Sequence, residues 1–114
     1  MSARARQDLA AVLRQAREWL ARPHNDFAWS PWADAAAALS EIDGLIARID
    51  AGDLPDRSDV EVLFLPTGSI QEVAESSGWG EEFIPLADRF DRALEWVYGS
   101  KLLAVARSLV TPRC

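Results

Sequence analysis

Four acidic residues in the second half of the chain have the types and spacing of a magnesium site. Glu72 and Glu75 stand three residues apart, and Asp88 and Asp91 repeat that spacing after an interval of twelve residues. Carboxylates at positions i and i+3 share one face of a helix. Two such pairs that face each other would offer Mg²⁺ the oxygen ligands that it prefers.

This double pair is similar to the Glu-x-x-Glu and Glu-x-x-Asp pattern of the all-α nucleoside triphosphate pyrophosphohydrolases of the MazG type. The resemblance implies that Glu72, Glu75, Asp88 and Asp91 bind magnesium and that the substrate is a triphosphate. Those enzymes are also helical domains of about this size. A Mg²⁺-dependent hydrolase is therefore one interpretation of the sequence.

The helical periodicity favours a different interpretation of the same acids. If Ile70, Val73 and Ala74 form the buried face of their helix, Glu72 and Glu75 point away from it. The two aspartates likewise lie off the apolar stripe of the next helix or at its flank. Acids outside a packed face are ordinarily solvated, so the sequence favours a protein without catalysis and without a cofactor.

Few residues are available for other kinds of catalysis. His24 is the only histidine and Cys114 the only cysteine, which excludes histidine-rich di-iron sites and the usual zinc sites. We expect a cytoplasmic protein, because one cysteine cannot form an intrachain disulfide and the first residues lack the apolar core of a signal peptide. The turn at Gly68 and Ser69 is either a phosphate cradle or a glycine turn with a capping serine.

Charge is distributed unevenly along this chain, whose net charge is −6. Residues 1–22 hold five arginines against two acids, residues 23–95 hold four arginines against sixteen acids, and residues 96–114 hold three basic residues and no acid. One interpretation is that the basic ends fold back against the acidic middle. The other is an acidic face for a basic partner, which would repel nucleic acid.

The spacing of apolar residues predicts an all-α fold: a small helical bundle of three long and two or three short helices, in one domain over residues 1–114. Long helices are expected over 5–21, 31–51 and 81–98, and short ones around 60–65, 69–76 and 101–110. The segment 60–65 also has strand-like composition, but the sequence offers it no second strand. Helix caps are expected at Ser30, Gly52, Ser58 and Ser69.

Five tryptophans are expected to dominate the core or an interface. Trp29 is predicted to enter the core from the loop at 23–30. Trp79 stands between two glycines, so it is either a core anchor or an exposed interaction residue. Asp43 and Asp50 lie at the edge of a buried helix face, where an acid needs a cation, and Arg89 or Arg92 of helix 81–98 is the expected partner.

The favoured interpretation is a non-catalytic interaction or regulatory protein of the antitoxin or immunity type. Its acidic surface, on helix 31–51 and on the linker with Asp53, Asp56 and Asp59, would face a basic protein, with Trp79 as a further contact. The alternative partner is a second copy of the chain, bound at Gly44 or Trp79. No apolar run is long enough to span a membrane, so no membrane partner is expected.

Overall fold

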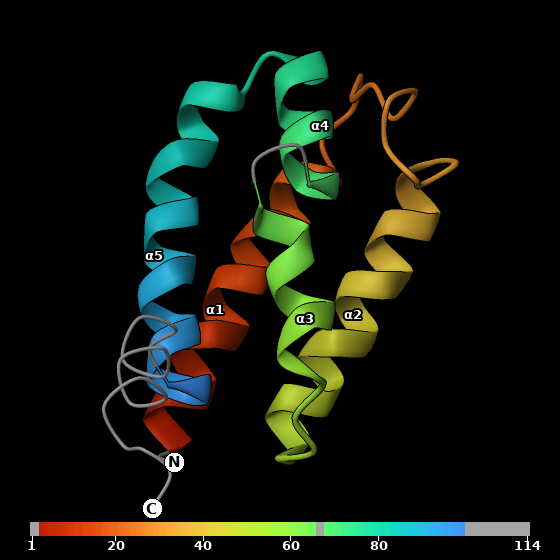
Figure 1. Cartoon of the computed structure of the whole chain (residues 1–114). Helices are drawn as coiled ribbons and strands as arrows, with labels where there is room; N and C mark the ends of the chain where they lie inside the picture. The colour runs from red at the N-terminus through yellow and green to blue at the C-terminus, as the bar shows by residue number, and fades with distance from the viewer. Residues whose placement is uncertain (1–2, 66–67, 100–114) are drawn as a thin grey trace, which may run out of the picture.

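The computed structural model of the protein describes residues 3–65 and 68–99, and this part of the chain is all α-helical, as predicted (Figure 1). Its elements are α1 (Ala3–Leu20), α2 (Ala35–Ala51), α3 (Arg57–Glu61), a short 3-10 turn η1 (Val62–Phe64), α4 (Ser69–Ser77) and α5 (Gly80–Tyr98). The predicted helix at 101–110 lies outside the described residues.

Helix α1 is the centre of the bundle. It packs against α2 on one side and against α5 on the other, while α3, η1 and α4 follow one another as a broken fourth column (Figure 1). The periodic stripe of α1 explains this position, because Leu9, Leu13, Ala16 and Leu20 are all fully buried. Helices α2 and α5 therefore present their outer faces to solvent, on opposite sides of α1.

A stack of three phenylalanine rings joins the broken column to α5. The ring centroids of Phe64 and Phe90 are 3.9 Å apart with 9° between the ring planes, and Phe64 also stacks on Phe83 at 5.7 Å. These rings need Phe64 to point inward, and the helical conformation of residues 57–64 achieves this. The helical interpretation of segment 60–65 is confirmed, and the strand interpretation is wrong.

The predicted start of α2 is wrong by four residues. The helix begins at Ala35, with Asp34 as its N-cap, and the Asp34 carboxylate accepts a hydrogen bond from the Ala37 amide at 2.9 Å. Ser30 instead makes a tight turn, in which its hydroxyl oxygen accepts from the Trp32 amide. The predicted end is confirmed, because Gly52 adopts a left-handed conformation and donates to two carbonyls of the last turn.

Two other predicted caps also differ from the structure. Asp56 precedes α3 and Gly68 precedes α4, so neither Ser58 nor Ser69 is an N-cap residue. Both serines lie inside the first turn of their helices. The capping-box pattern located both helices correctly but placed the N-cap of α3 two residues too late and that of α4 one residue too late.

The tryptophans divide between core and surface. Trp32 and Trp79 are buried, whereas Trp29 is 75% exposed and Trp96 is 66% exposed. The prediction that Trp29 enters the core is wrong, since Phe27 and Trp32 fill that end of the bundle instead. A tryptophan that leaves most of its ring in water is available for contacts with another molecule.

Candidate functional site

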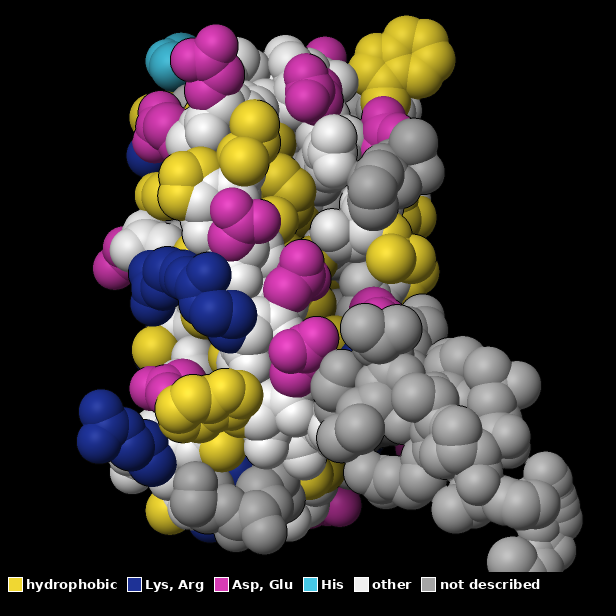
Figure 2. Space-filling view, turned by 60° about the vertical axis from the view of Figure 1, so that its left-hand side comes forward, with side chains coloured by type: hydrophobic (Ala, Val, Ile, Leu, Met, Phe, Trp, Pro, Cys, Tyr) yellow, Lys and Arg dark blue, Asp and Glu magenta, His cyan; other side chains and the backbone are white. Residues whose placement is uncertain are grey.

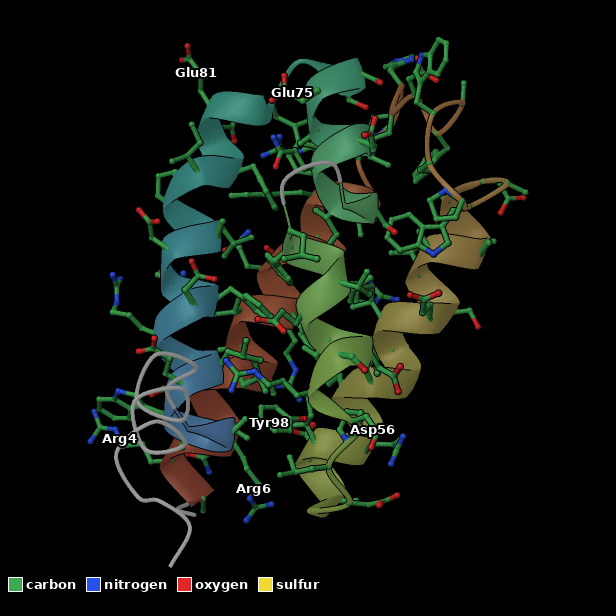
Figure 3. All side chains as sticks on the ribbon, in the orientation of Figure 1. Arg4, Arg6, Asp56, Glu75, Glu81 and Tyr98 are labelled. Atoms are coloured by element: carbon green, nitrogen blue, oxygen red, sulfur yellow. The ribbon has the colours of Figure 1, made fainter. Side chains whose placement is uncertain are left out.

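The structure does not bring the two predicted metal-binding pairs together. Glu72 and Glu75 lie on α4, and Glu75 turns toward the corner between α4 and α5 (Figure 3), where its carboxylate lies beside Gly80. Asp88 and Asp91 are exposed further along α5. Within residues 3–65 and 68–99, no three acidic, histidine or cysteine side chains are placed to hold a metal ion. These residues therefore supply no observation in favour of the magnesium site that the resemblance implies.

The turn at Gly68 is occupied by the chain's own backbone. A Cβ atom at Gly68 would lie 2.4 Å from the carbonyl oxygen of Val62 and 2.8 Å from that of Leu65. Carbonyl oxygens carry partial negative charge and repel an anion, so this geometry does not favour a phosphate. The glycine is needed because the carbonyls of Val62 and Leu65 pass too close for any side chain.

Two arginines of α1 neutralise acids on the neighbouring helix α2. Arg14 pairs with Asp50, and the two terminal atoms Arg17 Nη2 and Asp43 Oδ2 are 3.1 Å apart. The hydrogen bond from Arg17 holds the pKa of Asp43 below its usual value. The predicted partners, Arg89 and Arg92, are wrong because α5 lies on the far side of α1 from α2.

Arg22 continues this row of ion pairs at the end of α1. It bonds Glu82 of α5 at 3.0 Å, and its guanidinium lies over the rings of Trp19 and Trp79 at 5.3 and 5.8 Å from their centroids. The N-terminal basic segment thus folds back against acids of the middle of the chain, as one interpretation predicted. The basic residues after position 100 lie outside the described part.

Acidic residues remain in excess on the side of the bundle formed by α3 and α5. We call this the α3–α5 acidic surface; its members are Asp56, Asp59, Glu61, Asp88, Asp91 and Glu95. Figure 2 shows acidic side chains in a column down this side of the molecule. Arg57 is 3.8 Å from Glu61, but the other five acids form no ion pair with any residue that the structure describes. The surface is therefore strongly negative.

Asp91 lies at the centre of this surface, and its surroundings oppose its charge. Partial burial raises the pKa of Asp91, and the carboxylates of Asp88, Glu95 and Glu61 raise it further. Because α3 packs against α5, the carboxylate of Glu61 adds to this repulsion from the neighbouring helix. A positive group brought to this point would relieve that repulsion.

We expect Asp91→Asn to raise the melting temperature at pH 7 and to change it little at pH 3. A carboxyl with a raised pKa in the folded state holds its proton longer there than in the unfolded state. Its destabilising effect is therefore absent at low pH and develops as the pH rises through the interval between the two pKa values. Thermal unfolding followed by circular dichroism at both pH values measures this, and an equal change at both would contradict it.

The predicted linker residues are at the surface. Asp53, Asp56 and Asp59 are all exposed, and Arg48 approaches Asp53 at 3.3 Å. Figure 3 shows Asp56 near Tyr98 of α5, whose hydroxyl donates to the Pro55 carbonyl at 2.7 Å. This bond ties the linker to the end of α5, so Asp56 and Asp59 are held beside the acids of that helix.

Trp79 is a core residue in the structure, not a surface contact. It is 4% exposed, its indole nitrogen donates to Asn25 Oδ1 at 2.9 Å, and its ring meets that of Trp19 at 5.5 Å. The same Asn25 side chain donates to two carbonyls at the end of α1. Of the two placements that the sequence left open, the structure has the buried one, and Trp79 is not part of the proposed surface.

Exposed apolar side chains lie on α5 and in the segment that directly follows α3. Val62, Leu65 and Ile84 expose between 44% and 60% of their surface. Ile84 shares a face of α5 with Asp88 and Asp91, because positions i, i+4 and i+7 lie in one row on a helix. The spacing of these residues in α5 could have been recognised in the sequence, but the sequence does not indicate that α3 lies beside them.

Comparison of the chain with protein-family models, with curated proteins and with solved structures finds no match. The likeness to the MazG-type pattern thus rests on residue spacing alone. No helix in the described part of the chain is both long and apolar enough to cross a membrane.

Proposed function

We propose that this protein is a non-catalytic interaction module whose α3–α5 acidic surface binds a basic surface of another protein. An antitoxin or immunity protein works in this way when it covers the basic surface of its target. The observation that carries the proposal is the separation of charge. Arg14 and Arg17 of α1 and Arg22 just after it neutralise Asp50, Asp43 and Glu82, whereas five of the six acids on the α3–α5 surface have no such partner among the described residues.

The composition of the surface supports binding of a protein. Acids steer a basic partner and set its orientation, while desolvated apolar groups hold it. Ile84 and Val62 supply the apolar part, at 60% and 49% exposure. A positive side chain placed beside Asp91 would remove the repulsion that now raises the pKa of that carboxyl.

The test compares two variants with the same net charge. The first carries Asp59→Asn, Asp88→Asn and Asp91→Asn on the acidic surface. The control carries Glu18→Gln, Glu75→Gln and Glu81→Gln, which are exposed acids elsewhere on the molecule. The probe is an arginine-rich helical peptide, and its affinity is measured by titration calorimetry at about 0.05 M and 0.5 M salt, since salt screens such contacts.

We expect the surface variant to lose at least about tenfold in affinity at low salt, and the control to lose less than about threefold. Equal losses in both variants would show that the peptide responds only to net charge, and the proposal would then be abandoned. A photo-crosslinking residue at Val62 extends the test to whole proteins in cells. It should capture a partner that the same residue at Ala11, on α1, does not capture.

A further inference from the structure

The outer face of α5 carries two parallel rows of side chains. Each residue of the second row directly follows a residue of the first row in the sequence. The row facing α3 contains Ile84, Asp88, Asp91 and Glu95, and the row facing α1 contains Pro85, Arg89, Arg92 and Trp96. With 3.6 residues per turn, each set is spaced to form one stripe along the helix. All eight residues are exposed.

The direction of each row follows from its neighbours. Tyr98 continues the flank of Asp91 and Glu95 at i+7 and i+3, and its hydroxyl donates to the Pro55 carbonyl just before α3 at 2.7 Å, which places the acidic row on the α3 side. Asp8 and Val12 of α1 line a cavity of about 250 Å³ together with Arg89, Arg92 and Trp96, which places the basic row on the α1 side. Figure 2 shows basic side chains beside the acidic column on this face. Neither arginine forms an ion pair with a residue that the structure describes.

We infer that this face of α5 binds a second copy of the same chain, with the two α5 helices parallel. A two-fold axis parallel to the helices exchanges the two flanks of the face, so the basic row of each copy meets the acidic row of the other at the same height. A two-fold axis perpendicular to the helices leaves each flank on its own side. Basic would then meet basic and acidic would meet acidic.

The parallel arrangement brings both arginines of each face close to acids of the second copy. Arg92 lies between the heights of Asp88 and Glu95 of the second copy, one turn from each, and Arg89 lies within one turn of Asp91. At the beginning of the face, Ile84 of one copy meets Pro85 of the other. This self-complementary pattern is what an isologous interface requires.

The position of α5 leaves room for such a contact. It is the outermost helix on its side of the bundle (Figure 1), and its two most exposed apolar residues, Ile84 and Trp96, lie at either end of the face. One helix face buries less than the ~800 Å² per partner of a standard interface, so the dimer is expected to be weak and reversible. Since its contacts are ion pairs at the surface, salt should weaken it.

Self-association would cover Asp88, Asp91 and Glu95, which also belong to the proposed partner surface. A basic partner and the second copy would then compete, and partner binding would dissociate the dimer. The inference itself does not depend on that partner, because it rests on the two rows of α5 alone.

Two complementary variants test the inference by sedimentation equilibrium at about 0.02 M salt. Arg89→Glu with Arg92→Glu makes the face wholly acidic, and Asp88→Arg with Asp91→Arg makes it mainly basic. We expect each variant alone to self-associate at least about tenfold more weakly than the wild type. An equimolar mixture should associate at least as strongly as the wild type, since each face then meets its opposite.

The orientation is tested with Glu81→Cys in a Cys114→Ser background. Glu81 lies near the midline at the beginning of α5, so a parallel pair brings the two cysteines within disulfide distance, whereas an antiparallel pair separates them by about 27 Å at 1.5 Å per residue. Ala47→Cys, exposed on α2, is the matched control and should not cross-link.

A wild type that stays monomeric up to about 1 mM, or face variants that associate like the wild type, would overturn the inference. So would a mixture that fails to associate or the absence of the residue-81 disulfide.

These outcomes are separable from those of the proposed function. The doubly acidic variant, Arg89→Glu with Arg92→Glu, should bind the arginine-rich peptide at least as well as the wild type while it loses self-association. Loss of peptide binding in that variant would count against the proposed function, because the acidic row is intact there, whereas retained self-association would count against the inference.

Discussion

Phe90→Ala is expected to lower the free energy of unfolding by about 4 kcal/mol, the middle of the range for deleting a buried phenylalanine. Phe90 is 1% exposed, and its ring is stacked on Phe64 at 3.9 Å. The truncation leaves a cavity where α5 meets η1, and it removes the contact that holds the broken column to the bundle. Since small domains have only ~5–15 kcal/mol in total, urea unfolding followed by tryptophan fluorescence should show the midpoint fall sharply.

Two further variants keep this result interpretable. Trp96→Ala removes an even larger ring on the same helix, but this ring is 66% exposed, so the effect should stay within about 0.5 kcal/mol. Phe90→Leu retains most of the volume and should remain folded even if Phe90→Ala does not. A loss below about 2 kcal/mol for Phe90→Ala would mean that the Phe64–Phe90 stack is not part of the core.

The helices themselves were predictable because their apolar periodicity is strong. Helix α1 shows this best: Leu9, Leu13, Ala16 and Leu20 recur at the helical spacing, and all are buried. In α5 the same spacing separates Phe83, Phe90 and Leu94 from the charged face. The local pattern of apolar residues is enough to predict such helices, since each of them buries one continuous stripe of apolar side chains.

The start of α2 could not be predicted from the local sequence, because two residues compete to be its N-cap. Ser30 and Asp34 are both good N-cap residues, and Pro31 suits a first helical turn. The structure uses Asp34, because the chain before it turns back to bury Trp32, whose indole nitrogen donates to Glu41 at 3.3 Å. Burial of one large ring therefore moved the start of the helix by a full turn.

The sequence also did not predict which arginines form ion pairs with the acids of α2. The position of Asp43 and Asp50 at the edge of the buried face indicated that each needed a cation, and each has one. Which helix supplies that cation depends on the order of helices around α1. The α3–α5 acidic surface has the same origin, because its acids are far apart in sequence and are brought to one side only by the packing of α3 against α5.

Gly68→Ala is expected to lower the free energy of unfolding by about 3 kcal/mol, near the upper end of the usual cost of overpacking. The added Cβ would fall 2.4 Å from the Val62 carbonyl oxygen and 2.8 Å from that of Leu65. These are backbone atoms, so they cannot move aside as a flexible side chain can. The Gly68 amide also donates to the Leu65 carbonyl at 2.7 Å, and the Gly68 carbonyl accepts from the Glu72 amide, so the start of α4 would shift as well.

Gly44→Ala is the matched control, and its effect should have the opposite sign. Gly44 lies within α2, where a Cβ would meet nothing within 4 Å, so alanine there should stabilise the protein by about 1 kcal/mol through its better helix propensity. Urea unfolding of both variants measures the difference. A destabilised Gly44→Ala would indicate that this glycine is a contact point for another chain, and a neutral Gly68→Ala would show that the η1 carbonyls do not pass as close as the structure places them.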